Sequence, residues 1–136
     1  MTESFGSPQN HSRPLRILVV EDEFIIATDI AWSLQDLGHT VIGPAPTVNE
    51  ALYLVRSEQM DCAVLDANLH GSSSAPIAAE LAARDIKFVV LTGYANLKLE
   101  TPTLDSAPRI GKPFTAGDFS TALATLFPSG SSLADG

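Results

Sequence analysis

Short apolar runs along the chain lead into polar or charged residues. The four runs, with the residues that follow them, are 15–20 before Glu21, Asp22 and Glu23; 62–65 before Asp66; 88–91 before Thr92; and 107–110, shortly before Lys112 and Pro113. Strands of an open parallel sheet are buried on both faces and read as continuous apolar runs, while ligands gather beyond their carboxyl ends. The pattern therefore predicts buried strands whose polar ends share one crevice.

The segments between these runs carry apolar residues at helical spacing. Residues 24–37 form one such segment, and Gly38 suits its end. Thr47, with Glu50 three residues later, is typical of the start of a second helix. Further elements are predicted as a strand over 40–43, helices over 75–84 and 115–127, and a short or irregular helix over 94–99. The separations between the polar strand ends leave room for one strand-helix unit per step, and for two between the first end and the second.

Five strands alternating with helices predict an α/β fold with a doubly wound parallel sheet. We expect one domain over residues 15–127, with a flexible N-terminal arm at 1–14 and a flexible C-terminal tail at 128–136, because both ends are polar and rich in Ser, Gly or Pro. Cys62, the single cysteine, is expected to be a buried core residue, whereas Trp32 suits either the core margin or a partner contact.

Composition excludes two classes of partner. The chain has 136 residues and a net charge of −8, whereas nucleic-acid binding depends on clustered Lys and Arg. No apolar run approaches the roughly 20 residues that a membrane span requires. The start also lacks the positively charged and apolar segments of a signal peptide. We therefore expect no nucleic-acid or membrane partner, and favour cations and basic protein surfaces.

Taken together, these motifs resemble the receiver domain of two-component response regulators. That family has an acidic pair after the first strand, Asp after the third, Thr or Ser after the fourth, and Lys-Pro after the fifth. The resemblance covers about residues 15–127 and implies a flavodoxin-like sheet with strand order 2-1-3-4-5. It also implies a cis peptide between Lys112 and Pro113. Because the short tail at 128–136 leaves no room for an output module, we expect a stand-alone protein of the cytoplasm.

With the first and third strands adjacent, Glu21, Asp22 and Asp66 should meet in one crevice, where like charges repel unless a cation lies between them. Mg²⁺ fits, because it prefers oxygen ligands and commonly binds carboxylates together with a phosphate. The resemblance adds the backbone carbonyl of Asn68 as a ligand. The predicted metal ligands are thus Glu21, Asp22, Asp66 and Asn68.

By the same resemblance, Asp66 accepts a phosphoryl group from a phosphohistidine on a sensor histidine kinase or phosphotransfer protein. Lys112 would supply positive charge and Thr92 a hydroxyl donor, since phosphoryl transfer depends on positioning and on neutralising oxygen charge. The only chemistry expected is Mg²⁺-dependent self-phosphorylation and self-dephosphorylation of Asp66. The protein would then signal through contacts with a downstream protein or act as a phosphate sink.

Two positions depart from the family pattern. Glu21 replaces the more common Asp, which places its carboxylate one methylene further from the backbone. Arg109 occupies the position of an aromatic residue that serves the family as a switch; Tyr94, in a Thr-Gly-Tyr motif typical of a subgroup of stand-alone receivers, either replaces it or simply packs. His70 is expected to be an exposed loop residue, because receivers accept phosphate on Asp.

The alternative to a phosphorylated receiver is an unphosphorylated receiver-like module that binds a protein partner. The set Asp66, Thr92 and Lys112 argues against it. A phosphohydrolase with an Asp nucleophile would usually carry a second Asp two residues later, where this chain has Asn68.

Overall fold

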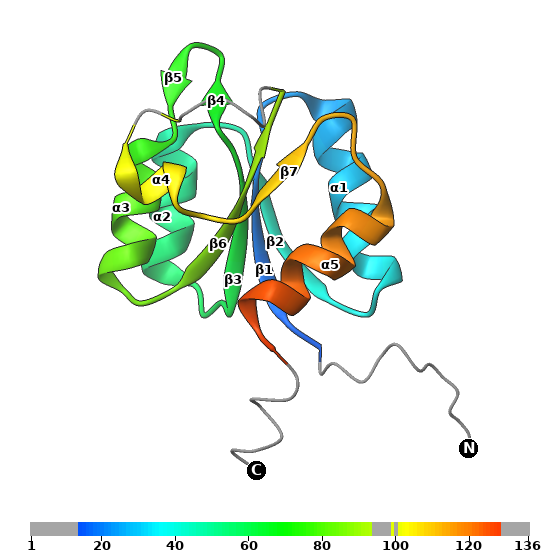
Figure 1. The fold of residues 1–136 in the computed structure, drawn as a ribbon. Coiled ribbons are helices and arrows are strands. Elements are labelled where there is room, and N and C mark those ends of the chain that lie inside the picture. Colours follow the sequence, from blue (N-terminus) through cyan, green and yellow to red (C-terminus); the bar gives the residue numbers. More distant parts are fainter. Residues whose placement is uncertain (1–13, 94–98, 100, 129–136) are drawn as a thin grey trace, which may run out of the picture.

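The computed structural model describes residues 14–93, 99 and 101–128. A five-stranded parallel sheet forms its centre, in the order β2-β1-β3-β6-β7 (Figure 1). The strands are β1 (Arg16–Val20), β2 (Thr40–Ala45), β3 (Cys62–Asp66), β6 (Lys87–Thr92) and β7 (Arg109–Gly111). The numbers β4 and β5 belong to a separate hairpin. The order is therefore the predicted 2-1-3-4-5, and the doubly wound, flavodoxin-like α/β fold is confirmed.

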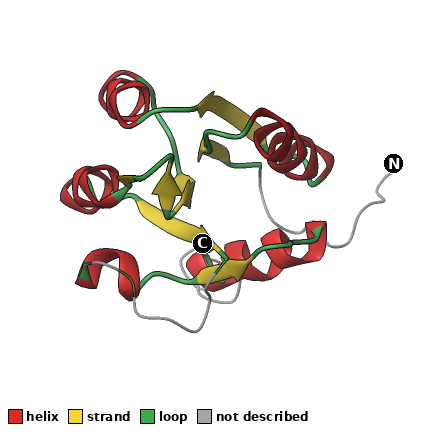
Figure 2. Cartoon of the chain, turned by 90° about the horizontal axis from the view of Figure 1, so that it is seen from above, coloured by secondary structure: helices red, strands yellow, loops and turns green. Residues whose placement is uncertain are grey.

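Helices cover both faces of the sheet, as the view from above shows (Figure 2). On one face lie α1 (Phe24–Asp36) and α5 (Ala116–Leu126), and on the other lie α2 (Val48–Ser57), α3 (Ala75–Ala83) and the short α4 (Pro102–Asp105). None of the helices in the described part of the chain is long and apolar enough to span a membrane.

Strands β1, β3 and β6 divide their side chains between two cores. Leu18 and Val20 of β1 pack in the core beneath α2 and α3, while Ile17 and Val19 pack in the core beneath α1 and α5. Because both faces are covered, the strands need no polar positions, which explains the uninterrupted apolar runs of the sequence. Cys62 is fully buried as predicted, and burial raises the pKa of its thiol to about 12.

Helix boundaries follow local capping chemistry. The Thr47 side chain accepts a hydrogen bond from the Glu50 N–H, as predicted for the start of α2. The predicted helix over 94–99 falls almost wholly outside the described residues. The short helix that the structure does describe begins at Pro102, which suits a first helical turn because its missing N–H is not needed there.

Two segments differ from the sequence expectation. Residues 67–74, which include the predicted loop residue His70, contain the antiparallel hairpin of β4 (Asn68–Leu69) and β5 (Ser72–Ser73). Strand β2 continues to Ala45 instead of ending at 43, because Gly43 adopts a φ of 92° that lets the strand pass an irregularity in its pairing with β1. The peptide bonds Gly43–Pro44 and Lys112–Pro113 are both cis, the second as the resemblance implies.

The bend at Gly43 generates a prediction about stability. A Cβ atom at this residue would lie 2.7 Å from the Ala45 nitrogen and 3.1 Å from the Val19 carbonyl oxygen, whereas one at Gly38, also at positive φ, would meet nothing within 4 Å. Gly38→Ala should therefore lose only about 1 to 2 kcal/mol for the left-handed backbone. Gly43→Ala should lose clearly more in urea denaturation. Equal losses would show that the backbone at Gly43 moves freely away from Val19.

Candidate functional site

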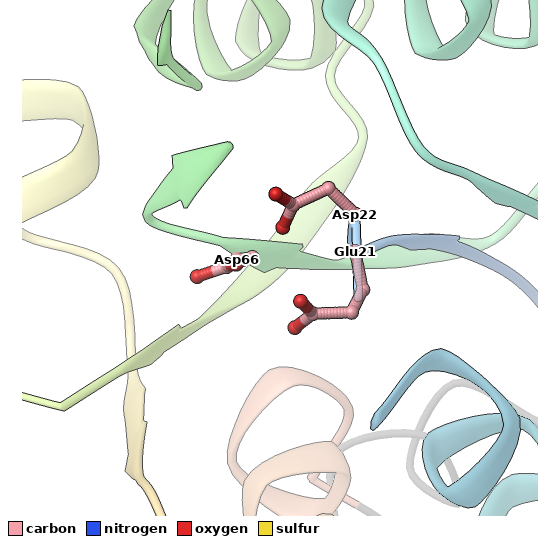
Figure 3. Close-up of side chains that lie close together, drawn as sticks. All are labelled: Glu21, Asp22 and Asp66. Atoms are coloured by element: carbon pink, nitrogen blue, oxygen red, sulfur yellow. The ribbon is translucent and has the colours of Figure 1, made fainter. Parts of the chain in front are cut away.

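The ends of β1 and β3 bring three carboxylates together. These strands pair in parallel, with Val20 opposite Leu65, so the acidic residues that follow β1 lie beside Asp66 at the end of β3. Figure 3 shows the carboxylates of Glu21, Asp22 and Asp66 facing a common space. One oxygen of each lies within 4.8 Å of the others. The structure thus assembles the three acids that the sequence predicts at one crevice.

Glu21 is the most deeply buried of the three acids, with only 1% of its surface exposed. Its backbone N–H donates to the Ala45 carbonyl, and its Oε2 accepts a hydrogen bond from the Glu23 N–H. Burial, together with the negative charge of Asp66, raises the pKa of Glu21 from an ordinary 4.5 to about 7, although the Glu23 N–H and Lys112 oppose the shift. The carboxyl group of Glu21 thus lies inside the protein.

Lys112 is the cation that faces these acids. Its Nζ lies 3.3 Å from Asp66 Oδ1 and 3.5 Å from Glu21 Oε1. Burial alone would lower the pKa of Lys112, but the carboxylates of Asp66 and Glu21 outweigh it and raise that pKa. The ammonium group is thus held charged at the crevice.

The other two predicted site residues lie next to Asp66. Thr92 is buried at the end of β6, one residue beyond Leu91, which pairs with Asp66, and its carbonyl accepts the Lys112 N–H. The Asn68 N–H donates to Asp66 Oδ1 over 3.3 Å, and the Asn68 side chain accepts the Gly71 N–H. The Asn68 carbonyl as a metal ligand stays a prediction.

The donor set fits a hard divalent cation. Three carboxylate oxygens converge, and such a set is the preferred environment of Mg²⁺. Among buried side-chain atoms in the described residues, only Glu21 Oε1 accepts no hydrogen bond. It forms an ion pair with Lys112 Nζ at 3.5 Å, and a buried oxygen that accepts no hydrogen bond is available to a cation.

One contact at this site is missed by the sequence reasoning. His70, expected as an exposed loop residue, does have a side chain that is 80% exposed, yet its Nδ1 lies 2.6 Å from Asp22 Oδ2. The signal that could have found it is the pair His70-Gly71, because a two-residue loop with Gly between short strand segments is typical of a hairpin.

Arg109, which occupies the position of the family's aromatic switch residue, makes several polar contacts. Arg109 forms an ion pair with the Asp105 side chain and also donates to the Asp105 carbonyl. Asp105 Oδ1 in turn accepts the Leu99 N–H over 2.7 Å. These contacts fasten α4 to β7 and to the end of the connection that begins at Thr92. Tyr94, the suggested substitute for the aromatic residue, lies outside the described residues.

An apolar groove begins at the acids. It has a volume of about 370 Å³ and runs between α1 and β2, lined among others by Glu21, Asp22, Phe24 and Trp32. Phe24, Ile25 and Trp32 are each at least 66% exposed, which excludes the core role considered for Trp32.

Comparison with known proteins identifies the family. The sequence profile of the response regulator receiver domain matches residues 17–124. The chain belongs to this family.

Relatives of this receiver include longer regulators. The transcriptional regulatory protein PdtaR of Mycobacterium tuberculosis is 29% identical over 81% of the chain and 55% of PdtaR. The receiver thus spans about half the length of the curated relatives it matches. The solution structure of SdrG from Sphingomonas melonis Fr1 is 40% identical, has a TM-score of 0.73, and is matched over 83% of this chain and 96% of SdrG.

A more distant structure shares the fold. The receiver domain of sensor histidine kinase PA1611 from Pseudomonas aeruginosa PAO1, solved with a magnesium ion coordinated in its active site cleft, is 20% identical with a TM-score of 0.69. The match covers 83% of this chain and 97% of that domain.

The raised pKa of Glu21 generates a prediction for the metal-free receiver. Because the folded-state pKa of about 7 lies above the ordinary 4.5, the folded protein binds the extra proton more tightly than the unfolded chain. This stabilisation is complete below pH 4.5 and is lost as the pH rises through 7. With EDTA present, the free energy of unfolding should fall by up to about 3 kcal/mol between pH 4.5 and 8.

Glu21→Gln should remove most of this loss in urea denaturation, because its amide does not titrate. Glu23→Gln, which removes an exposed carboxylate two residues along, should keep the wild-type pH dependence. Parallel stability curves for wild type and Glu21→Gln would mean that Glu21 is charged throughout this range.

Proposed function

We propose that this receiver accepts a phosphoryl group on Asp66 from a phosphohistidine of a sensor histidine kinase or phosphotransfer protein, in a Mg²⁺-dependent reaction. The observation that carries the proposal is the position of the Asp66 carboxylate between the Lys112 ammonium group at 3.3 Å and two further carboxylates. Such a site supplies a nucleophile and a fixed positive charge, and it suits a cation. These are the components that phosphoryl transfer needs.

In the proposed step, a carboxylate oxygen of Asp66 attacks phosphorus as the P–N bond of the donor breaks. The donor imidazole leaves with the bonding electron pair and takes up a proton, and an acyl phosphate forms on Asp66. Lys112 neutralises charge on the phosphoryl oxygens, and the Thr92 hydroxyl donates to one of them. Attack by water on the same phosphorus returns the free carboxylate, so the chemistry acts on the protein itself rather than on an external substrate.

The residues proposed to hold Mg²⁺ are Glu21, Asp22 and Asp66, together with the Asn68 carbonyl. When bound, the cation offsets the repulsion between the carboxylates and the incoming phosphoryl group. The magnesium ion in the cleft of the PA1611 receiver supports this assignment. Glu21 must lose its proton to serve as a ligand, so Mg²⁺ should bind more tightly above pH 7 than below it.

The donor protein must cover the mouth of this site in order to place its phosphohistidine against Asp66. Helix α1 begins at that mouth, and its exposed Phe24, Ile25 and Trp32 offer apolar area beside an acidic rim. We assign this surface to the phosphodonor protein. Aromatic side chains of this kind often dominate binding energy at protein interfaces.

We propose that the phosphorylated receiver signals by binding a downstream protein, or that it serves only as a sink for phosphoryl groups from the donor. The acidic net charge of −8 supports protein partners rather than nucleic acid. A kinase partner of this kind would place the protein in the cytoplasm.

Asp66→Asn should abolish phosphorylation, because the amide cannot act as the nucleophile. Wild type incubated with Mg²⁺ and a small acyl phosphate should gain the mass of one phosphoryl group in intact mass spectrometry. Asp29→Asn, which neutralises an exposed carboxylate on α1, should be labelled like wild type. Full labelling of the Asp66 variant would place the acceptor elsewhere.

Asp22→Ala should weaken Mg²⁺ binding at least about tenfold, because a carboxylate about 4 Å from a divalent cation contributes roughly 2 kcal/mol of attraction even in water. Glu23→Ala should have little effect, since that side chain is exposed and lies outside the three-carboxylate group. Calorimetric titration with Mg²⁺ measures both losses. Losses of equal size would show that the two acids attract the cation only through their general charge.

A further inference from the structure

The contact between His70 and Asp22 connects the hairpin that follows β3 to the end of β1. Only 7% of the Asp22 side chain is exposed, and one of its oxygens, Oδ2, lies 2.6 Å from His70 Nδ1. At this separation the imidazole nitrogen and the carboxylate oxygen are in direct polar contact. It links two segments that no sheet pairing joins at this level, and His70 has no part in the phosphoryl transfer proposed above.

The hairpin is itself firmly anchored, so the position of His70 is set by the backbone. Leu69 is buried in the core with α3, and the Asn68 side chain accepts the Gly71 N–H over 2.7 Å. At the base, the Ser74 hydroxyl donates to the Ala67 carbonyl and the Ser73 hydroxyl accepts the Ala75 N–H. Figure 1 shows the hairpin at the end of the sheet where β1 and β3 finish.

The backbone alone does not call for histidine at this turn. His70 and Gly71 connect the paired residues Leu69 and Ser72, and both have positive φ, 51° and 82°. Two-residue hairpin turns of this type strongly prefer Asn-Gly or Gly-Gly. A histidine is tolerated at positive φ more readily than most side chains, but it is not the residue that the turn favours. The His70 side chain places a ring nitrogen beside Asp22, and the turn itself does not require this contact.

We propose that His70 is a positioning residue for Asp22: it holds one carboxylate oxygen of Asp22 and thereby leaves the other turned to the cation. Asp22 shares its crevice with Glu21 and Asp66, and repulsion between like charges favours swinging its carboxylate away. A partner at Oδ2 opposes this movement. Groups that orient a metal ligand in this way typically change metal affinity 10–100-fold when removed.

This inference rests on the Mg²⁺ site of the proposed function, and two substitutions at the same residue test it. Both Gly and Asn suit the positive φ of position 70, so both variants should keep the hairpin and the wild-type stability to urea. Asn also carries a nitrogen on Cγ, in the place of Nδ1, whereas Gly carries none. Calorimetric titration with Mg²⁺ alone, at one pH above 7, gives the affinity of each variant.

We expect His70→Gly to weaken Mg²⁺ binding about tenfold and His70→Asn to restore an affinity close to that of wild type. Unchanged or tighter binding by His70→Gly would overturn the inference, and so would an equal loss in both variants, which would point to the imidazole ring itself. If wild type binds no Mg²⁺, the metal site of the proposed function fails and the role of His70 fails with it. Normal Mg²⁺ binding by wild type with an unaffected Gly variant leaves the proposed function standing and removes only this inference.

Discussion

Repulsion between carboxylates is the constraint around which the functional end of this receiver is organised. Two full charges at about 4 Å repel by about 4 kcal/mol at the effective dielectric constant typical of protein surfaces. In this fold each of the three acids has a different group that reduces the repulsion. Lys112 pairs with Asp66, His70 contacts Asp22, and Glu21 has a raised pKa and binds a proton near neutral pH. A divalent cation between the three carboxylates would offset the same repulsion directly.

The parallel sheet makes this crowding unavoidable, because pairing fixes which residues meet. Val20 lies opposite Leu65, and Asp66 lies opposite Leu91. The carboxyl ends of β1, β3 and β6 therefore lie side by side, together with the polar residues found there. The backbone hydrogen bond from Lys112 to the Thr92 carbonyl then extends the series to the segment after β7. A single shift of register along any of these pairs would carry a functional side chain to the opposite face.

Much of this arrangement can be predicted from the sequence, for identifiable reasons. Strands covered on both faces leave uninterrupted apolar runs, and the Thr47 cap follows from local chemistry. The lateral order of the strands can be predicted only from the family resemblance, since periodicity carries no information on which strands are neighbours. The acids and Lys112 could be placed together only once that order was assumed.

Other features leave little or no pattern in the sequence. The hairpin strands β4 and β5 have two residues each, too few for an alternation to be visible. The ion pair of Arg109 with Asp105 joins residues whose proximity follows from a short helix among prolines. The raised pKa of Glu21 results from burial, and a strand end followed by three acids looks exposed when read as sequence.

The form of β2 has a consequence for how separate molecules meet. An edge strand offers unpaired backbone groups on which another chain can form a further strand, leading to aggregation. Here that edge is interrupted by the bend at Gly43 and by Pro44, which has no N–H to donate. The opposite edge, β7, has only three residues. Both borders of the sheet thus resist intermolecular strand pairing.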